Sequence, residues 1–237
     1  EAVEDLTHRG IAGNGPVTFE IAPGEYYEQL IIGSIAGTDT VSTVTFKGAS
    51  ITETTALSSK NTDPQNPHII RLNKAKHIQF NNLIFRVDQA SSYHWGIHLF
   101  NRCDNIKITE CFFEDTQNRF YHIVASNSTS STIEQGDNIN SLLIEKCNFV
   151  NGQSAVCITG KEDRYSKKIV IRNNKFTNLY FSALQLNYLD SFVIDANLIE
   201  MNPAGDTTSK GIYLGYTKGA FHITNNRIIK ARAYGIE

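Results

Sequence analysis

Isoleucine and phenylalanine alternate with polar residues in short stretches that recur along the chain. Six stretches share the pattern x-I-x-I-x-x-N/C-x-F/I at intervals of 23–36 residues: 77–85, 105–113, 141–149, 168–176, 191–199 and 220–228. Alternation with a period of two predicts a β-strand that buries one face. The repetition therefore predicts strands that return in the same order and orientation.

A second pattern, small-apolar-x-apolar, precedes each of these stretches. Its copies recur every 24–33 residues, at 69–72, 96–99, 122–125, 155–158, 183–186 and 211–214, with a partial copy at 235–237. Two or three short strands in a period of about 20–30 residues predict a solenoid. A leucine-rich repeat needs a Leu-rich consensus and a helical segment, and the variable spacing argues against the strict left-handed hexapeptide type. We therefore predict an all-β fold, a right-handed parallel β-helix.

Stacked coils place equivalent residues about 4.8 Å apart, so the pattern predicts ladders of like side chains. One inward column contains Ile144, Ile171 and Ile194. A coil corner contains Asn174, Asn197 and Asn226, preceded at the same position by Cys111 and Cys147. We expect the two cysteines to fill the corner as small buried residues; a disulfide between them depends on their Cβ geometry and stays open.

The chain divides into an N-terminal cap with the first coils, residues 1–66, and β-helix repeats, residues 67–237, in one continuous domain. Residues 1–8 form an amphipathic pattern that predicts a short helix capping the solenoid end. Strands are expected at 17–21, 29–32 and 43–47, and the Thr/Ser/Asn/Pro-rich stretch 51–67 predicts a loop. The chain stops as a new coil begins, which predicts a fragment of a longer protein.

Composition removes several classes of protein. The 237 residues carry 22 Lys and Arg against 24 Asp and Glu, a formal charge of −2, so no basic excess indicates nucleic-acid binding. No stretch approaches the roughly 18 apolar residues of a membrane-spanning helix. No signal peptide is visible, and four cysteines do not by themselves indicate a compartment.

The first 50 residues resemble the opening of β-helix modules in large secreted and cell-surface proteins of Bacteroidetes. The similarity rests on Gly10-Ile11, Gly15-Pro16-Val17-Thr18-Phe19 and Gly24-x-Tyr26-x-Glu28. This resemblance implies an extracellular or cell-surface location, further domains in the same long polypeptide, and export by a type IX secretion machinery. It implies no activity.

The Gly24-x-Tyr26-x-Glu28 motif also resembles the first motif of pectin methylesterases, where its role is mainly structural. The catalytic motifs of that family have no match in this chain; the nearest remnant, Glu114-Asp115-Thr116, stands in a different context. The resemblance therefore carries no catalytic residue over to this protein.

Catalytic chemistry is not indicated by the outward positions of the first-strand copies. Glycosidases need two carboxyl groups about 5–10 Å apart, and lyases need a base beside a charge neutraliser. The expected outward, exposed column is Arg71, His98, Val124, Cys157, Gln185 and Tyr213, with Glu237 as its one acid at the end of the chain. It contains no pair of carboxylates, so no catalytic residue is predicted. A metal site from His94, His98 and His122 lacks a defined spacing, and we predict no metal and no cofactor.

An aromatic cluster around Trp95 is the best candidate for ligand binding. Aromatic rings stack on sugar rings, while His and Arg form hydrogen bonds and ion pairs. The candidate glycan-binding residues are Trp95, His98, Arg119, Tyr121 and Tyr213. The chain is thus predicted to be a non-catalytic extracellular stalk, adhesin or glycan-binding scaffold whose partner is a polysaccharide or cell-surface glycan. The alternative is a polysaccharide-active lyase, esterase or hydrolase whose site lies in a loop or outside this sequence.

Overall fold

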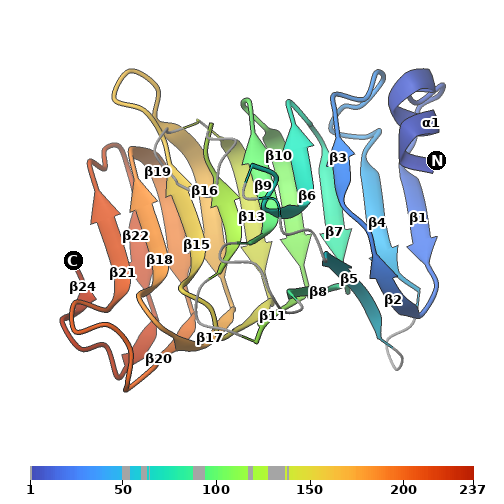
Figure 1. Ribbon diagram of the computed structural model, residues 1–237. Coiled ribbons are helices and arrows are strands. Elements are labelled where there is room, and N and C mark those ends of the chain that lie inside the picture. The colour runs from blue at the N-terminus through green and yellow to red at the C-terminus, as the bar shows by residue number, and fades with distance from the viewer. Residues whose placement is uncertain are drawn as a thin grey trace.

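The computed structural model is a parallel β-helix (Figure 1). It describes residues 2–49, 54–59, 63, 65–87, 94–116, 120–127, 137 and 139–237. Three sheets of eight strands each run along the solenoid axis, and every strand pair within them is parallel. The predicted fold class is confirmed.

The three sheets take their strands in strict rotation from successive coils. Sheet A contains β1 (Val17–Ile21), β4 (Val44–Gly48), β7 (Ile78–Asn81), β10 (Asp104–Thr109), β13 (Asn140–Glu145), β16 (Ser166–Arg172), β19 (Leu189–Asp195) and β22 (His222–Thr224). Sheet B contains β2 (Gly24–Tyr27), β5 (Thr55–Ser59), β8 (Ile84–Val87), β11 (Phe112–Asp115), β14 (Asn148–Val150), β17 (Lys175–Leu179), β20 (Leu198–Met201) and β23 (Arg227–Ile229). Sheet C contains β3 (Leu30–Ile32), β6 (His68–Asn73), β9 (Trp95–Phe100), β12 (Tyr121–Ala125), β15 (Ser154–Thr159), β18 (Ser182–Asn187), β21 (Lys210–Gly215) and β24 (Tyr234–Ile236).

The core consists of the predicted inward columns. In sheet A, Ile171 pairs with Ile144 on one side and Ile194 on the other, and all three are buried. In sheet B, a column of phenylalanine rings is stacked at centroid distances of 4.8 Å: Phe85, Phe113, Phe149 and Phe176. Identical side chains in register thus bury a continuous apolar column along the axis.

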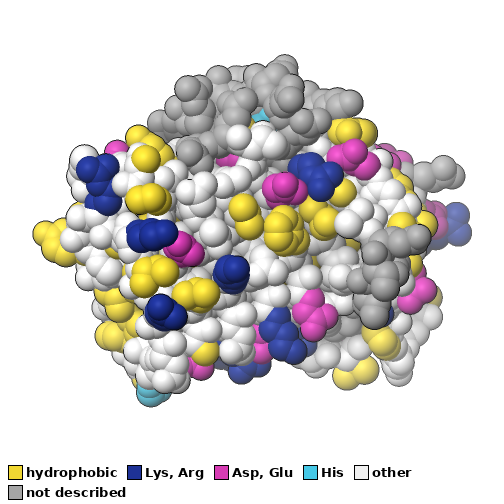
Figure 2. All heavy atoms as spheres, turned by 90° about the horizontal axis from the view of Figure 1, so that it is seen from below, with side chains coloured by type: hydrophobic (Ala, Val, Ile, Leu, Met, Phe, Trp, Pro, Cys, Tyr) yellow, Lys and Arg dark blue, Asp and Glu magenta, His cyan; other side chains and the backbone are white. Residues whose placement is uncertain are grey.

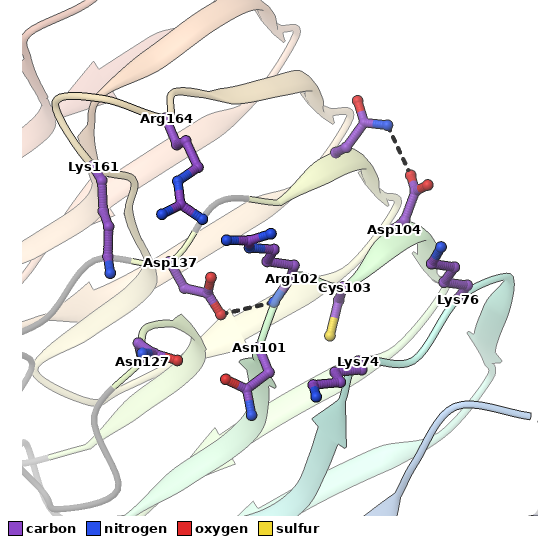
Figure 3. A pocket seen from close by; sticks show the side chains of 11 residues that line it. Lys74, Lys76, Asn101, Arg102, Cys103, Asp104, Asn127, Asp137, Lys161 and Arg164 are labelled. Carbon is purple, nitrogen blue, oxygen red and sulfur yellow. Dashed lines mark hydrogen bonds between the residues drawn. The ribbon is translucent and has the colours of Figure 1, made fainter.

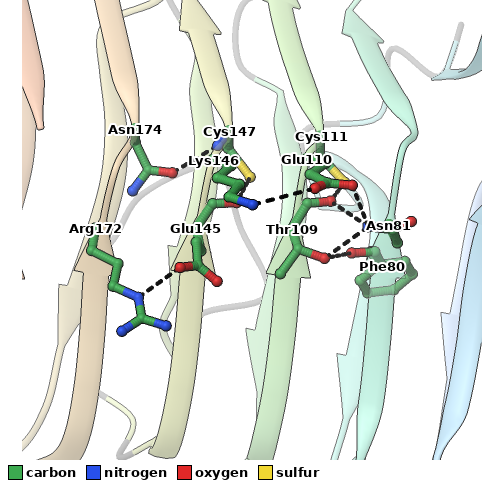
Figure 4. A network of polar contacts seen from close by, with 10 residues as sticks. All are labelled: Phe80, Asn81, Thr109, Glu110, Cys111, Glu145, Lys146, Cys147, Arg172 and Asn174. Atoms are coloured by element: carbon green, nitrogen blue, oxygen red, sulfur yellow. Dashed lines mark hydrogen bonds and ion pairs between the residues drawn. The ribbon is translucent and has the colours of Figure 1, made fainter. Parts of the chain in front are cut away.

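The corner between sheets A and B is held by the predicted asparagine ladder, of which Figure 4 shows the bond between Asn174 and Cys147. Asn174 Oδ1 accepts a hydrogen bond from the main-chain N of Cys147 at 2.8 Å. Asn197 Oδ1 accepts two hydrogen bonds from Asn174, and Asn226 Oδ1 accepts two from Asn197. Cys111 and Cys147 occupy this corner as free, buried thiols. The ladder satisfies buried main-chain groups that the turn removes from the sheets.

Helix α1 (Ala2–Arg9) lies at the N-terminal end of the solenoid, beside β1 (Figure 1). Its residues Val3 and Leu6 pack against the hydrophobic core. Gly10, at φ +70°, ends the helix, and its main-chain N donates to Leu6 O at 2.8 Å. The helix covers the open end of the core, as the sequence predicts. Within the described residues, no helix has the length and apolar character that crossing a bilayer requires.

The loop expected at residues 51–67 is wrong for part of that stretch. Residues Thr55–Ser59 form β5, which pairs with β2 and β8 and is buried throughout. Its Thr and Ser side chains gave a turn-like composition, whereas the parallel neighbours on both sides hold the segment extended. The strand β2 was likewise not predicted, because its sequence Gly-Glu-Tyr-Tyr has no apolar alternation.

Candidate functional site

The outward column of sheet C has the predicted register. Arg71 pairs with His98, His98 with Val124, Val124 with Cys157, Cys157 with Gln185, and Gln185 with Tyr213. The expectation that this column is exposed is wrong for its first four members, which are at most 8% exposed. Only Gln185 and Tyr213 are partly accessible. The outer face of sheet C is therefore closed to solvent over its first half.

A polar cluster lies under this closed part of sheet C. Arg71 Nε donates to His98 Nδ1 at 3.1 Å, and His98 Nε2 donates to Ser126 O at 2.9 Å. These two contacts place the imidazole proton on Nε2 and leave the ring neutral. Burial, and then the Arg71 guanidinium, lower the pKa of His98 to about 3. The indole of Trp95 packs edge-on against His98, with ring centroids 4.6 Å apart.

The predicted glycan-binding residues do not form one accessible surface. Trp95 and His98 are both fully buried, so neither presents a ring face to a ligand. Tyr121 and Tyr213 are half-buried, and the ring of Tyr213 lies beneath Lys210 Nζ at 4.5 Å. Arg119 lies outside the described residues. The side chains at the centre of the predicted cluster, Trp95 and His98, are therefore inaccessible to a ligand.

The three histidines weighed for a metal site do not converge. Register pairing places His122 at the position of Gly96, on the inward side of β12, where its ring contacts Phe113 and Phe149. His98 points to the opposite face of the same sheet. Burial lowers the pKa of His122 to about 4, and its Nε2 donates to Asn151 O at 2.8 Å. Among the described residues, no group of three His, Cys, Asp or Glu side chains could hold a metal ion.

Several acidic side chains on sheets A and B pair with basic neighbours on adjacent coils. Examples are Glu114 with Arg86 at 3.1 Å and Glu145 with Arg172 at 2.7 Å, the second drawn in Figure 4. Seen from below Figure 1, side chains of both signs are interspersed over the surface (Figure 2). Asp115, at the end of β11, differs from these acids and is fully buried.

One corner of the solenoid, directly after the strands of sheet C, carries exposed aromatic rings. Its residues have positive φ: Lys74 (56°), Asn101 (57°), Tyr188 (54°) and Tyr216 (53°). We name these four residues the corner row. Tyr188 and Tyr216 stack face to face, with centroids 4.7 Å apart and planes 5° apart, and Tyr165 packs edge-on against Tyr188. Partial burial and the neighbouring Tyr216 raise the pKa of Tyr188, so its hydroxyl stays protonated.

Further along the same corner, the chain forms a pocket of about 630 Å³ (Figure 3). Its charged lining consists of five basic residues, Lys74, Lys76, Arg102, Lys161 and Arg164, and two acidic ones, Asp104 and Asp137. This basic pocket is not apparent from the sequence, because its cations are spread over 90 residues of chain. The available signal was positional: each basic residue follows a strand of sheet C by one to five residues.

The thiol in the basic pocket is not a nucleophile. Cys103 is buried, and burial raises the pKa of its thiol to about 12. Its Sγ donates to Leu72 O at 3.2 Å. The pocket thus offers positive charge and amide groups, and the chemistry it supports is binding of an anion.

Comparisons with known proteins identify the fold and no more. A family model described as "Right handed beta helix region" matches residues 95–237. Two structures of the pectin methylesterase from Aspergillus niger, one deglycosylated and one retaining an N-acetylglucosamine stub, are 11% identical in sequence, with TM-scores of 0.43 and 0.44. Each alignment covers 97% of this chain and 81% of the esterase. No curated protein matches the sequence.

Proposed function

The chain belongs to the right-handed β-helix family, and we propose that it is a non-catalytic glycan-binding module whose contact surface is the stacked pair Tyr188 and Tyr216. The opening residues, through their resemblance, support a place in a larger extracellular or cell-surface protein. Its partners are then a polysaccharide or cell-surface glycan, the neighbouring domains of the same polypeptide and the secretion machinery.

The observation that carries this proposal is the bare ring of Tyr216. The residue is 69% exposed, although its other face is stacked on Tyr188. Flat aromatic faces pack against the C–H faces of sugar rings, while hydroxyl groups at the ring edge form hydrogen bonds. The stack therefore offers one free platform on a rigid edge.

The backbone at this corner gives no reason for tyrosine. Positive φ is adopted at least cost by Gly and Asn, and Asn101 fills the same position three coils before Tyr188. A bulky aromatic residue in this conformation is strained, so two of them in succession are better explained by what their rings contact. This argument favours a surface role for Tyr188 and Tyr216.

The outer face of sheet C supports the non-catalytic part of the proposal. In the described residues of its central column, from Arg71 to Tyr213, there is no carboxylate. Acid–base cleavage of a glycosidic bond needs at least one such group or an equivalent base facing the substrate. The polysaccharide-active enzyme is thus the weaker alternative.

Tyr216→Ala tests the contact surface directly. Glycan-array screening of the wild type, followed by calorimetry on the hits, is expected to give weak binding, roughly micromolar to millimolar, because a shallow edge buries little of its ligand. Tyr216→Ala should weaken it about tenfold, and Tyr216→Phe should retain it, since the ring is kept. Tyr234→Ala removes another exposed tyrosine outside the corner row and serves as the matched control.

Two results would contradict the proposal. An array without a hit, or a loss of binding equal in Tyr216→Ala and Tyr234→Ala, removes the tyrosine pair as a glycan platform. Release of reducing ends, unsaturated products or methanol from uronic-acid polymers would instead establish the enzyme alternative.

A further inference from the structure

We infer that the basic pocket binds the oxyanion groups, carboxylate or sulfate, of an acidic glycan whose sugar rings lie on Tyr188 and Tyr216. The inference rests on the proposed function and adds the chemical class of the ligand. It concerns the corner between sheets C and A, and not the closed outer face of sheet C.

Four of the five cations of the pocket have no ion-pair partner among the described residues. Within the described part of the chain, Lys74, Lys76, Arg102 and Lys161 form no ion pair, and Arg164 is paired only with the exposed Asp163. This contrasts with sheets A and B, where basic side chains such as Arg86 and Arg172 are paired across coils. Unpaired like charges gathered in a concave site create a positive potential that attracts anions.

The two carboxylates of the pocket are engaged in holding its walls. Asp137 Oδ2 accepts a hydrogen bond from the main-chain N of Arg102 at 2.9 Å, and Asp104 Oδ1 accepts one from Asn140 Nδ2 at 3.0 Å. Figure 3 shows Asp137 between Arg102 and the loop that carries Lys161 and Arg164. The two acids thus hold the turn at Arg102 and the start of β13, and four unpaired cations against two carboxylates leave the pocket positive.

One loop joins the pocket to the tyrosine pair. In residues 160–166, Lys161 and Arg164 line the pocket, while the next residue, Tyr165, packs on Tyr188 at 5.7 Å. Main-chain hydrogen bonds of 2.9 Å and 3.0 Å between Lys161 and Arg164 close the loop into a tight turn. The charged and the aromatic surfaces are therefore held in fixed relation on adjacent coils.

The combination selects a ligand. Guanidinium groups match the planar oxygens of carboxylate and sulfate, and ammonium groups add point charge. Amide side chains at the pocket wall, Asn101, Asn127 and Asn140, suit sugar hydroxyls. A saccharide chain that carries oxyanions satisfies both surfaces, whereas a neutral glycan uses only the tyrosines.

The test compares polygalacturonate and a sulfated galactan with neutral dextran and an oligonucleotide, by calorimetry at low and at physiological salt. The double variant Lys161→Gln/Arg164→Gln removes two pocket cations, and Lys175→Gln/Arg227→Gln removes two exposed cations on sheet B as the charge-matched control. We expect one acidic glycan to bind at least tenfold more tightly than dextran, with the advantage lost in the pocket variant, retained in the control and reduced by salt. Comparison of the affinities for polygalacturonate and for the sulfated galactan shows whether carboxylate or sulfate is preferred.

The outcomes separate the two proposals. Equal binding of acidic and neutral glycans, unaffected by the pocket variant but lost in Tyr216→Ala, overturns the acidic ligand and leaves the glycan platform. Equal or tighter binding of the oligonucleotide overturns it as well, because the pocket is then a general polyanion site. Absence of binding to every glycan overturns both.

Discussion

Asn197 accepts two hydrogen bonds from Asn174 through a single oxygen. Its Oδ1 lies 3.0 Å from the main-chain N and 3.0 Å from the Nδ2 of Asn174. Its own Nδ2 donates to Ile171 O at 2.9 Å. One side chain, only 1% exposed, thus links two coils of the solenoid and satisfies three buried polar groups.

Asn197→Ala should lower the free energy of unfolding by about 2–4 kcal/mol, because the main-chain N of Asn174 and Ile171 O lose this partner in the interior and Asn174 Nδ2 keeps only Ile144 O. Denaturant unfolding followed by circular dichroism measures the change. Asn148→Ala, an exposed asparagine in β14, should stay within about 0.5 kcal/mol of the wild type. Equal effects of the two substitutions would show that the ladder does not hold the coils together.

Ile171→Asp places a carboxylate between Ile144 and Ile194, where no partner is available. The cost is roughly 4 kcal/mol or more, enough to prevent recovery of soluble native protein. Its neighbour Val170 points to the other face, so Val170→Asp should cost only about 1 kcal/mol. A stable Ile171→Asp protein would show that the inward and outward faces of sheet A are assigned the wrong way round.

The buried histidines should make the protein sensitive to mild acid. The pKa of His122 is about 4 in the folded protein, against the ordinary value of 6.5, because burial disfavours the charged ring. The free energy of unfolding is therefore unaffected by this histidine above pH 6.5. It decreases as the pH falls from 6.5 towards 4, because the unfolded chain binds the proton first. Each such histidine steepens the fall by up to about 1.4 kcal/mol per pH unit.

His122→Ala should remove one histidine's share of that slope between pH 5 and 6, whatever its effect on absolute stability. The small residues Gly96 and Ala155 at the same position show that the coil accepts alanine there. Chemical denaturation at several pH values gives the slope, and His222→Ala, at an exposed position, is the control. An unchanged slope in His122→Ala would mean that the ring is already charged in the folded protein.

Trp95 is the single tryptophan of the chain and is fully buried. Its fluorescence should lie at short wavelength and resist quenching by acrylamide, and a bound glycan should leave it unchanged. Strong quenching that a glycan relieves would return the binding surface to the segment around Trp95 and count against Tyr216.

The fold could be predicted from the sequence because each coil repeats the same pattern of apolar and polar residues. The alternation around Ile171 fixes which residues face inward, and the recurrence of Asn174, Asn197 and Asn226 marks the corner. β5 was missed because Thr55, Ser58 and Ser59 are polar, although sheet neighbours and burial override that preference. Here the information lies in the adjacent coils and not in the strand.

The site was harder to predict for a related reason. The register of Arg71 with His98 follows from the repeat, but the burial of both side chains does not. The basic pocket forms only when Lys74, Arg102 and Lys161 are brought together by stacking of successive coils. No local sequence motif indicates this pocket, and the net charge does not indicate it either, because the chain as a whole carries −2.

The corner row has a consequence for how such a surface changes in evolution. Lys74, Asn101, Tyr188 and Tyr216 share one left-handed backbone conformation, so different side chains stand at the same corner of different coils. The residues of a conventional pocket depend on one another, whereas each coil contributes its own residue to this edge. Duplication or exchange of single coils would therefore lengthen, shorten or reorder the residues along the edge. A ligand with its own regular repeat is the kind that can contact several coils in the same way.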